Sequence, residues 1–166
     1  MPVFGPLLCG SRLTAVRKRS IIIQKTMKGV IPMAKSFRMK CPHCGNVVNL
    51  PGSGSCPKCG TPLDVNQPAA IALYRMGNFM GAANGFGIYI NNEPFGAIAN
   101  RESLIIPLPY GTYQMHVVCG MNRKCNDPII TLTPQDPYVC LKVHMKMGFV
   151  QNTFILERVD PSTMPQ

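Results

Sequence analysis

This sequence has no tryptophan and few acids or imidazoles: its 166 residues include seven Asp and Glu and three His. General acid–base catalysis depends largely on these side chains, so few combinations remain from which a catalytic centre could be built. No stretch approaches the roughly 20 consecutive apolar residues of a membrane-spanning helix, and no helical period stands out. We therefore expect no membrane span, no enzyme and no small-molecule substrate.

Cysteine, by contrast, is abundant, with eight in the chain. Four of them form two copies of a Cys-Pro-X-Cys-Gly motif, in which proline presets the turn and glycine supplies a positive φ where the chain leaves it. Two cysteines separated by two residues can hold a metal ion from one turn, and two such turns complete a tetrahedron of thiolates. The spacing predicts a metal site made by Cys41, Cys44, Cys56 and Cys59.

Zinc is the ion that four thiolates favour. Because the cysteines fill its coordination shell, we expect one structural zinc ion and an exposed, non-ligating His43. The hairpin over 46–55 has little apolar material, so the metal would supply its folding energy. The alternatives are two disulfides or a redox pair. Disulfides would require an oxidising compartment, and no secretion signal is visible.

The segment 33–62 resembles the short zinc ribbons found at the ends of many bacterial proteins. Its four cysteines match that pattern residue by residue. A short polar connector over 63–69 follows and predicts a boundary between the ribbon and a second domain.

Most of the positive charge lies before the ribbon. Residues 1–40 hold nine Lys and Arg and no acid, whereas residues 41–166 hold eight basic and seven acidic residues. Residues 1–32 lack the order of a secretory signal. We interpret them as a disordered basic tail, a transit peptide or a mis-assigned upstream extension, and we favour the extension, with Met33 as the natural start.

The remaining chain alternates short apolar runs with turn residues, a pattern typical of an all-β fold. Within two of the runs, every second residue is apolar, as in a sheet with one face on a core. We predict an antiparallel β-sandwich of about seven strands over 70–160, followed by a tail at 161–166. The expected strands are Ile71–Met76, Phe86–Ile90, Leu104–Leu108, Tyr113–Cys119, Ile129–Leu132, Tyr138–Met145 and Phe154–Val159.

Two stretches carry a second resemblance. Gly87–Gly96 looks like the strand–turn–strand opening of PEGA-like bacterial β-sandwich domains, and Ile105–Tyr113 is similar to the Pro-X-Gly-X-aromatic turn that follows it. The end of the chain, at Lys142–Phe149 and Leu156–Glu157, looks like the closing strands of a related uncharacterised family. This resemblance implies a non-catalytic interaction or envelope module and carries over no catalytic residue.

Three further cysteines leave alternatives open. A Cys–His pair built on Cys119 or Cys140 would make an enzyme, although no local signature supports it. Cys119 and Cys125 would form a disulfide in an exported protein, and free thiols are expected in a reducing cytosol. His116 and His144 fall on the outward faces of their predicted strands, where solvated side chains are expected.

We therefore predict a non-enzymatic binding or scaffold module of the bacterial cytoplasm, whose ribbon and one sheet face dock a protein partner. The alternative is nucleic-acid binding through the ribbon, because zinc ribbons serve both uses. Its expected contacts are the flanking basic residues Lys35, Arg38, Lys40 and Lys58. A basic, aromatic patch on the sandwich is a further alternative, although the usual explanation is a solvated face. Its members would be Tyr138, Lys142, Lys146, Arg123 and Lys124.

Overall fold

A computed structural model describes residues 36–77 and 83–165. The predicted basic tail, the proposed start at Met33 and the candidate contact Lys35 lie outside these residues. The described chain forms twelve β-strands and one short 3₁₀ turn, so the all-β class is confirmed. In this part of the chain, a helix of the length and apolarity needed to cross a membrane is not found.

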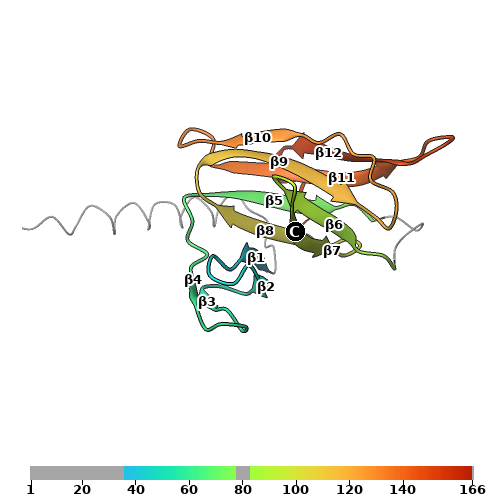
Figure 1. The fold of residues 1–166 in the computed structure, drawn as a ribbon. Helices are drawn as coiled ribbons and strands as arrows, with labels where there is room; N and C mark the ends of the chain where they lie inside the picture. Colours follow the sequence, from blue (N-terminus) through green and yellow to red (C-terminus); the bar gives the residue numbers. More distant parts are fainter. Residues whose placement is uncertain (1–35, 78–82, 166) are drawn as a thin grey trace, which may run out of the picture.

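The first four strands belong to the cysteine-containing region, and the other eight form the sandwich (Figure 1). The bounds of the first group are β1 Phe37–Lys40, β2 Val47–Leu50, β3 Gly54–Ser55 and β4 Pro62–Leu63. The second group is β5 Ala69–Arg75, β6 Phe86–Ile90, β7 Glu93–Ile98, β8 Ser103–Leu108, β9 Gly111–Val118, β10 Ile129–Leu132, β11 Tyr138–Lys146 and β12 Thr153–Val159.

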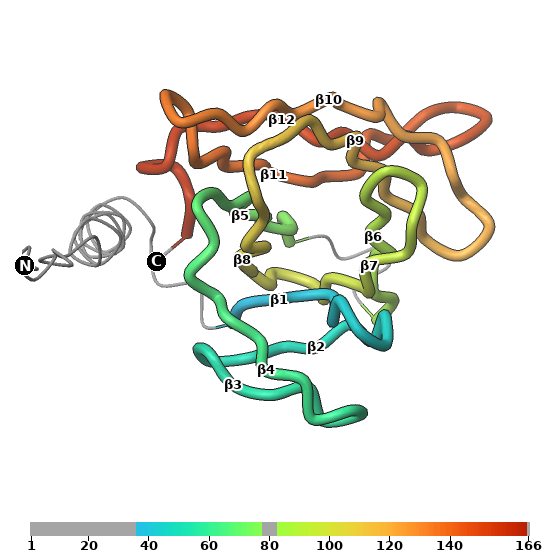
Figure 2. The backbone as a smooth tube through the Cα atoms, turned by 60° about the vertical axis from the view of Figure 1, so that its left-hand side comes forward, coloured from blue at the N-terminus to red at the C-terminus, as the bar shows by residue number. Residues whose placement is uncertain are grey.

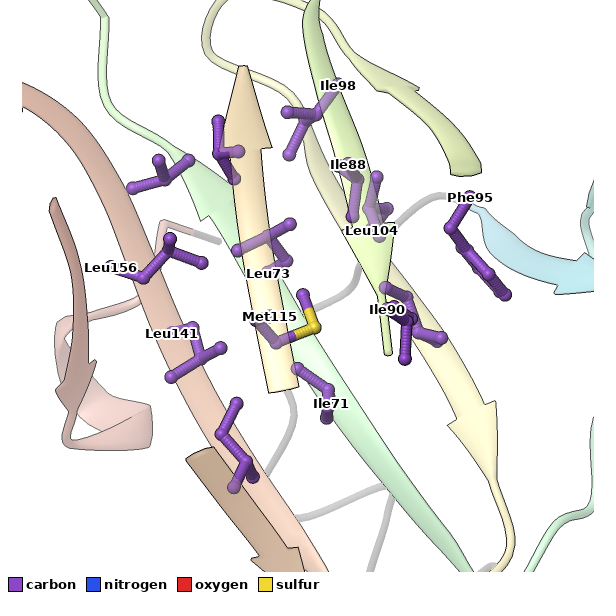
Figure 3. Close-up of a cluster of buried hydrophobic side chains, with 14 of the residues drawn as sticks. Ile71, Leu73, Ile88, Ile90, Phe95, Ile98, Leu104, Met115, Leu141 and Leu156 are labelled. Carbon is purple, nitrogen blue, oxygen red and sulfur yellow. The ribbon is translucent and has the colours of Figure 1, made fainter. Parts of the chain in front are cut away.

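Two sheets face each other across one apolar core. The larger sheet has the order β12-β11-β5-β8-β1-β2, and the smaller one has the order β10-β9-β6-β7. Side chains from both sheets meet between them, as Figure 3 shows for Leu73 and Leu141 of the larger sheet and Ile88 and Met115 of the smaller sheet. Burial of this core is the main stabilising contribution to the sandwich.

The predicted alternation within strands is confirmed. In β9, Met115 and Val117 are buried, and His116 between them is partly exposed. In β11, Leu141 and Val143 are buried in the core, whereas Lys142 faces outward. The period of two thus correctly identified which face of each strand lies on the core.

The larger sheet is mixed, and the sandwich has one strand more than the seven predicted runs. β5 pairs with β11 in parallel, and sequence alternation carries no information on the direction of a distant partner. The additional strand is β7, which begins at Glu93 directly after the turn expected within Gly87–Gly96. The turn is limited to Asn91 and Asn92, both with positive φ, and the edge position of β7 tolerates a proline that cannot donate to the ladder.

The cysteine-containing region continues the larger sheet. β1 pairs with β8 in parallel through Phe37 and Ile105, and the Ile105 amide donates to the Ser36 carbonyl at 3.2 Å. Figure 2 shows the β1–β2 hairpin beside β8, with β3 and β4 beyond it. The ribbon is therefore attached through backbone hydrogen bonds as well as through the chain that leads to β5.

The expected connector over 63–69 and the described part of the expected tail, residues 161–165, both contain buried side chains. Leu63 and Val65 are buried, and the Asp64 carboxylate accepts a hydrogen bond from the Ser53 hydroxyl at 2.9 Å. At the other end, Pro161–Thr163 form the 3₁₀ turn, and Met164 is buried against β5 and β11. Within the expected connector, only residues 64–68 lie between strands β4 and β5, and the sequence did not reveal these packed side chains.

Candidate metal centre

The two Cys-Pro-X-Cys-Gly motifs fold into two turns with the same hydrogen bonds. In the first turn, the Gly45 amide donates to the Cys41 carbonyl at 2.9 Å. In the second turn, the Gly60 amide donates to the Cys56 carbonyl at 2.8 Å. Both glycines have positive φ, at 69° and 73°, which glycine adopts without steric cost. The repeated sequence therefore produces a repeated turn, and each turn presents two sulfur atoms.

The four sulfur atoms have the spacing of a tetrahedral thiolate site. Sγ of Cys41 lies 3.6 Å from Sγ of Cys59, and Sγ of Cys44 lies 3.6 Å from Sγ of Cys56. All four lie within 4.8 Å of one another. Tetrahedral zinc–sulfur bonds of about 2.3 Å place the sulfurs about 3.8 Å apart. The prediction that these four cysteines converge is confirmed, and the cluster is suited to one metal ion.

Part of this cluster is buried. Cys41 and Cys56 are buried and pack with Val48 and Leu63, whereas Cys59 at the rim is exposed. Such a small apolar cluster contributes little folding free energy by itself, which is the situation in which a metal ion contributes most. His43 is exposed, as predicted, and is not a member of the four-cysteine cluster.

Hydrogen bonds from the second turn favour a thiolate at Cys59. The Thr61 hydroxyl lies 3.2 Å from Cys59 Sγ, and together with the Thr61 backbone amide it lowers the pKa of Cys59 to about 5. At Cys44 the Asn46 amide acts in the same direction, but desolvation and the neighbouring sulfurs raise the pKa to about 12. A bound cation would favour the thiolate at Cys44 as well, because it stabilises every thiolate around it.

Arg38 joins the ribbon to the sandwich. Only 5% of this residue is exposed. Its Nε donates to Asn49 Oδ1 at 2.8 Å, its Nη1 donates to the Ala97 carbonyl, and its Nη2 lies 3.5 Å from Glu102 Oε1. Burial lowers the pKa of Arg38, and the Glu102 carboxylate partly offsets this effect. Gly96, with φ of 86°, packs on the Arg38 side chain from β7.

These contacts correct the expected set of nucleic-acid contacts. The Arg38 guanidinium is buried against the sandwich, so it is not presented to a phosphate. Lys40 forms an ion pair with Glu93 across the same junction, although its side chain is partly exposed. Lys58 is exposed. Among the three candidates that the structure describes, Lys58 is therefore the one that faces solvent without an ion pair.

The structure also places the other candidate residues. Cys140 is buried beside Ala72 and Met164. Cys119 and Cys125 are free thiols. His144 lies 3.8 Å from Glu157 Oε1 on the outer face of β11. Within the described residues, His116 pairs with Asp127 and His144 with Glu157, and no hydrogen bond joins either histidine to Cys119 or Cys140.

Two features lie outside the sequence predictions. The first groups His116 with Cys125 and Asp127, which are nine and eleven residues further along the chain. The second gathers exposed apolar side chains from two loops, and we call it the apolar tip. It consists of Met121, Met147, Phe149 and Val150. Hydrogen bonds of Asn122 with Asn152 and Gln151 place the two loops side by side, although they are distant in sequence.

Comparison with known proteins adds no relative. No protein-family model matches this chain, and a search of curated proteins finds no match. The resemblances to short zinc ribbons and to PEGA-like domains therefore remain predictions. The function has to be argued from the sites themselves, since a β-sandwich supports many unrelated functions.

Proposed function

We propose that this protein is a non-enzymatic binding module that carries one structural zinc ion in its ribbon and docks a protein partner through the apolar tip. The observation that carries the docking proposal is the near-complete exposure of large apolar side chains on two adjoining loops. Phe149 is 107% exposed, Met121 98% and Val150 94%.

The donor set supports zinc as the metal. Soft thiolates select zinc over calcium and magnesium, which take oxygen ligands. The sulfur spacing of 3.6 Å is close to that of a tetrahedral zinc–thiolate centre. With four protein sulfurs around the ion, no position is left for water or substrate. The proposed zinc is therefore structural, and it joins the turn between β1 and β2 to the turn between β3 and β4.

Thiol chemistry supports a binding role over an enzymatic one. A nucleophilic cysteine normally has a lowered pKa. Burial instead raises the pKa of Cys140 and, with a contribution from Asp127, that of Cys125. Neither thiol has the lowered pKa that is typical of a nucleophilic cysteine.

Hydrogen bonds hold the two loops of the apolar tip together. Asn122 Nδ2 donates to the Asn152 carbonyl at 2.9 Å, and Gln151 Nε2 donates to Asn122 Oδ1 at 3.0 Å. In Figure 1 the end of the β11–β12 hairpin projects beyond the rest of the sandwich. The exposed apolar side chains therefore lie on loops that are already ordered by hydrogen bonds, which lowers the entropy lost when a partner binds.

The composition of the tip indicates the chemistry of its partner. Methionine, phenylalanine and arginine are enriched in protein interfaces, and methionine adapts to irregular surfaces. Neither tryptophan nor tyrosine, the residues typical of a membrane interface, occurs at the tip. Exposed Arg123, Lys124 and Lys146 border it, and residues 117–126 and 144–156 contain no acid. A protein with an apolar patch bordered by carboxylates fits this surface best.

The test compares two variants of the full chain. Phe149→Asp adds a charge to the centre of the apolar tip, and Tyr110→Asp adds the same charge to an exposed aromatic residue in the β8–β9 turn. β8 runs antiparallel to β5 and β11 runs parallel to β5, so this turn lies at the opposite end of the sandwich. Quantitative affinity capture identifies proteins retained by the wild type, and each candidate is then titrated in purified form by calorimetry.

The expected result is a purified partner whose affinity falls at least tenfold with Phe149→Asp and stays unchanged with Tyr110→Asp, since the tip would be the centre of the interface. Equal loss with both variants would refute docking at the tip. The same two variants are assayed against random DNA and RNA and against vesicles containing phosphatidylserine. Binding to nucleic acid or to vesicles that depends on Phe149 would replace the protein partner with that ligand.

A further inference from the structure

His116, Cys125 and Asp127 form a second cluster of metal-ligating atoms, separate in sequence from the ribbon. His116 lies on β9, and the other two residues lie in the connection between β9 and β10. One nitrogen, one sulfur and one oxygen donor from these residues all lie within 4.8 Å of one another. This is the range that the ligands of a single ion occupy.

The histidine and the aspartate are already oriented toward each other. His116 Nδ1 lies 2.6 Å from Asp127 Oδ1. Asp127 has φ of 46°, in the left-handed region that aspartate enters more readily than most other side chains. An aspartate therefore suits the backbone conformation at position 127 and also supplies the carboxylate.

The loop that carries Cys125 and Asp127 is fixed on β12. The side chain of Asn126, between them, donates to the Leu156 carbonyl at 2.8 Å and accepts from the Leu156 amide at 2.9 Å. The Asn126 amide donates to the Phe154 carbonyl at 3.2 Å. These bonds hold the loop without help from an ion, so its ordering would not have to be driven by metal binding.

The cluster is partly open to solvent. The His116 side chain is 23% exposed and the Asp127 side chain is 40% exposed. An ion can therefore reach the donor atoms, and a water molecule can occupy a remaining coordination position. The ribbon differs in this respect, because its four sulfurs complete the shell.

We propose that His116, Cys125 and Asp127 form a second metal site, which takes a divalent transition-metal ion of the zinc class with one nitrogen, one sulfur and one oxygen ligand. Calcium and magnesium fit less well, because they avoid sulfur and nitrogen. Zinc accepts all three donor types, and three protein ligands plus water is a known zinc arrangement.

Binding requires a small local rearrangement. Zinc bonds of about 2.0 to 2.2 Å at a tetrahedral angle place nitrogen and oxygen about 3.4 Å apart. The 2.6 Å contact between His116 and Asp127 therefore opens as the ion takes the place of the shared proton. The neutral imidazole then carries its proton on Nε2, and the Cys125 thiol releases its proton to solvent. The net change is the loss of one proton from the site.

The test is the metal stoichiometry of the full chain without an affinity tag. Native mass spectrometry with added zinc is expected to show two ions in the wild type, one of which is removed first by a mild chelator. Cys125→Ser and Asp127→Asn are expected to bind one ion. Cys119→Ser changes a neighbouring thiol outside the cluster and is expected to retain two. Cys44→Ser damages the ribbon and is expected to keep the ion at the second site.

Cobalt substitution provides a readout that does not depend on affinity alone. The ribbon contributes four thiolates and the second site contributes one, so Cys125→Ser should remove a small, separate part of the thiolate-to-cobalt absorption. Near-UV circular dichroism identifies any variant that fails to fold. Asp127→Asn is nearly isosteric with the wild type, so it decides whether the cluster binds a metal ion. A folded Asp127→Asn with the wild-type stoichiometry and affinity would overturn the proposal. One ion in the wild type, lost only with Cys44→Ser, would show that the cluster is a hydrogen-bonded network and would also overturn it.

Discussion

Replacing Arg38 with methionine is expected to destabilise the protein more than any change to an exposed basic residue of the ribbon. Methionine keeps much of the apolar stem but removes all three polar interactions of the guanidinium. The partners of the guanidinium are Asn49 Oδ1, the Ala97 carbonyl and the Glu102 carboxylate. Because Arg38 belongs to β1 and two of these partners belong to the sandwich, the substitution weakens the junction between the ribbon and the sandwich.

The magnitude follows from the burial of each partner. The hydrogen bond from the buried, charged Arg38 to the Ala97 carbonyl contributes about 1.5 kcal/mol, and the bond to the exposed Asn49 side chain about 0.5 to 1 kcal/mol. The Glu102 side chain is 26% exposed and 3.5 Å from the guanidinium, so we discount that pair to about 1 kcal/mol. The expected loss is about 3 kcal/mol, which corresponds to a fall in Tm of about 9 °C for a chain of this size.

The assay is differential scanning calorimetry of zinc-saturated protein, with Lys58→Met as the matched control. Lys58 is an exposed cation of the same ribbon, and its replacement should change the unfolding free energy by no more than about 0.5 kcal/mol. If Arg38→Met were as stable as Lys58→Met, the buried interactions would not hold the junction, and our reasoning on Arg38 would be wrong.

Three further changes test other parts of the structure. Cys59→Ser is expected to lose the ribbon zinc, because hydroxyl is a poor zinc ligand, and hydrogen exchange should then show residues 41–63 unprotected while β5–β12 stay protected. Gly96→Ala, at φ of 86° with ordinary contact distances around the new methyl group, should cost about 1 to 2 kcal/mol in urea unfolding, whereas no change would show that the backbone relaxes freely. Tyr138→Phe should leave stability unchanged or raise it by up to about 1 kcal/mol, because the buried phenol makes no hydrogen bond within the described residues. Burial raises the pKa of Tyr138 to about 12, so the same variant should also remove a phenol ionisation at high pH from a titration followed by ultraviolet absorbance.

The four-cysteine cluster could be predicted from the sequence because its determinants are local. Each pair of cysteines lies within one turn, and the Pro and Gly of each motif set the backbone of that turn. The alternation of β9 and β11 was equally local, since a strand places successive side chains on opposite faces. The cysteine convergence, the all-β class and the buried faces of these strands followed from patterns no longer than one turn or one strand.

The sequence did not determine how distant strands and loops meet. The parallel pairing of β5 with β11, the attachment of β1 to β8 and the strand β7 depend on partners far along the chain or on an edge position. The role of Arg38 depended on burial: this candidate phosphate contact instead donates to the Ala97 carbonyl and pairs with Glu102. The grouping of His116 with Cys125 and Asp127, and the gathering of the apolar tip, likewise arise from the packing of loops that are distant in sequence.

The sequence by itself therefore determined the chemistry of the ribbon, because ligand identity and turn geometry are written within a few residues. Only the tertiary structure decided which charges are buried, which apolar side chains remain exposed and which donors from different segments share one site. These are properties of contacts between segments, and their free energies depend on burial and distance, which a local pattern does not contain.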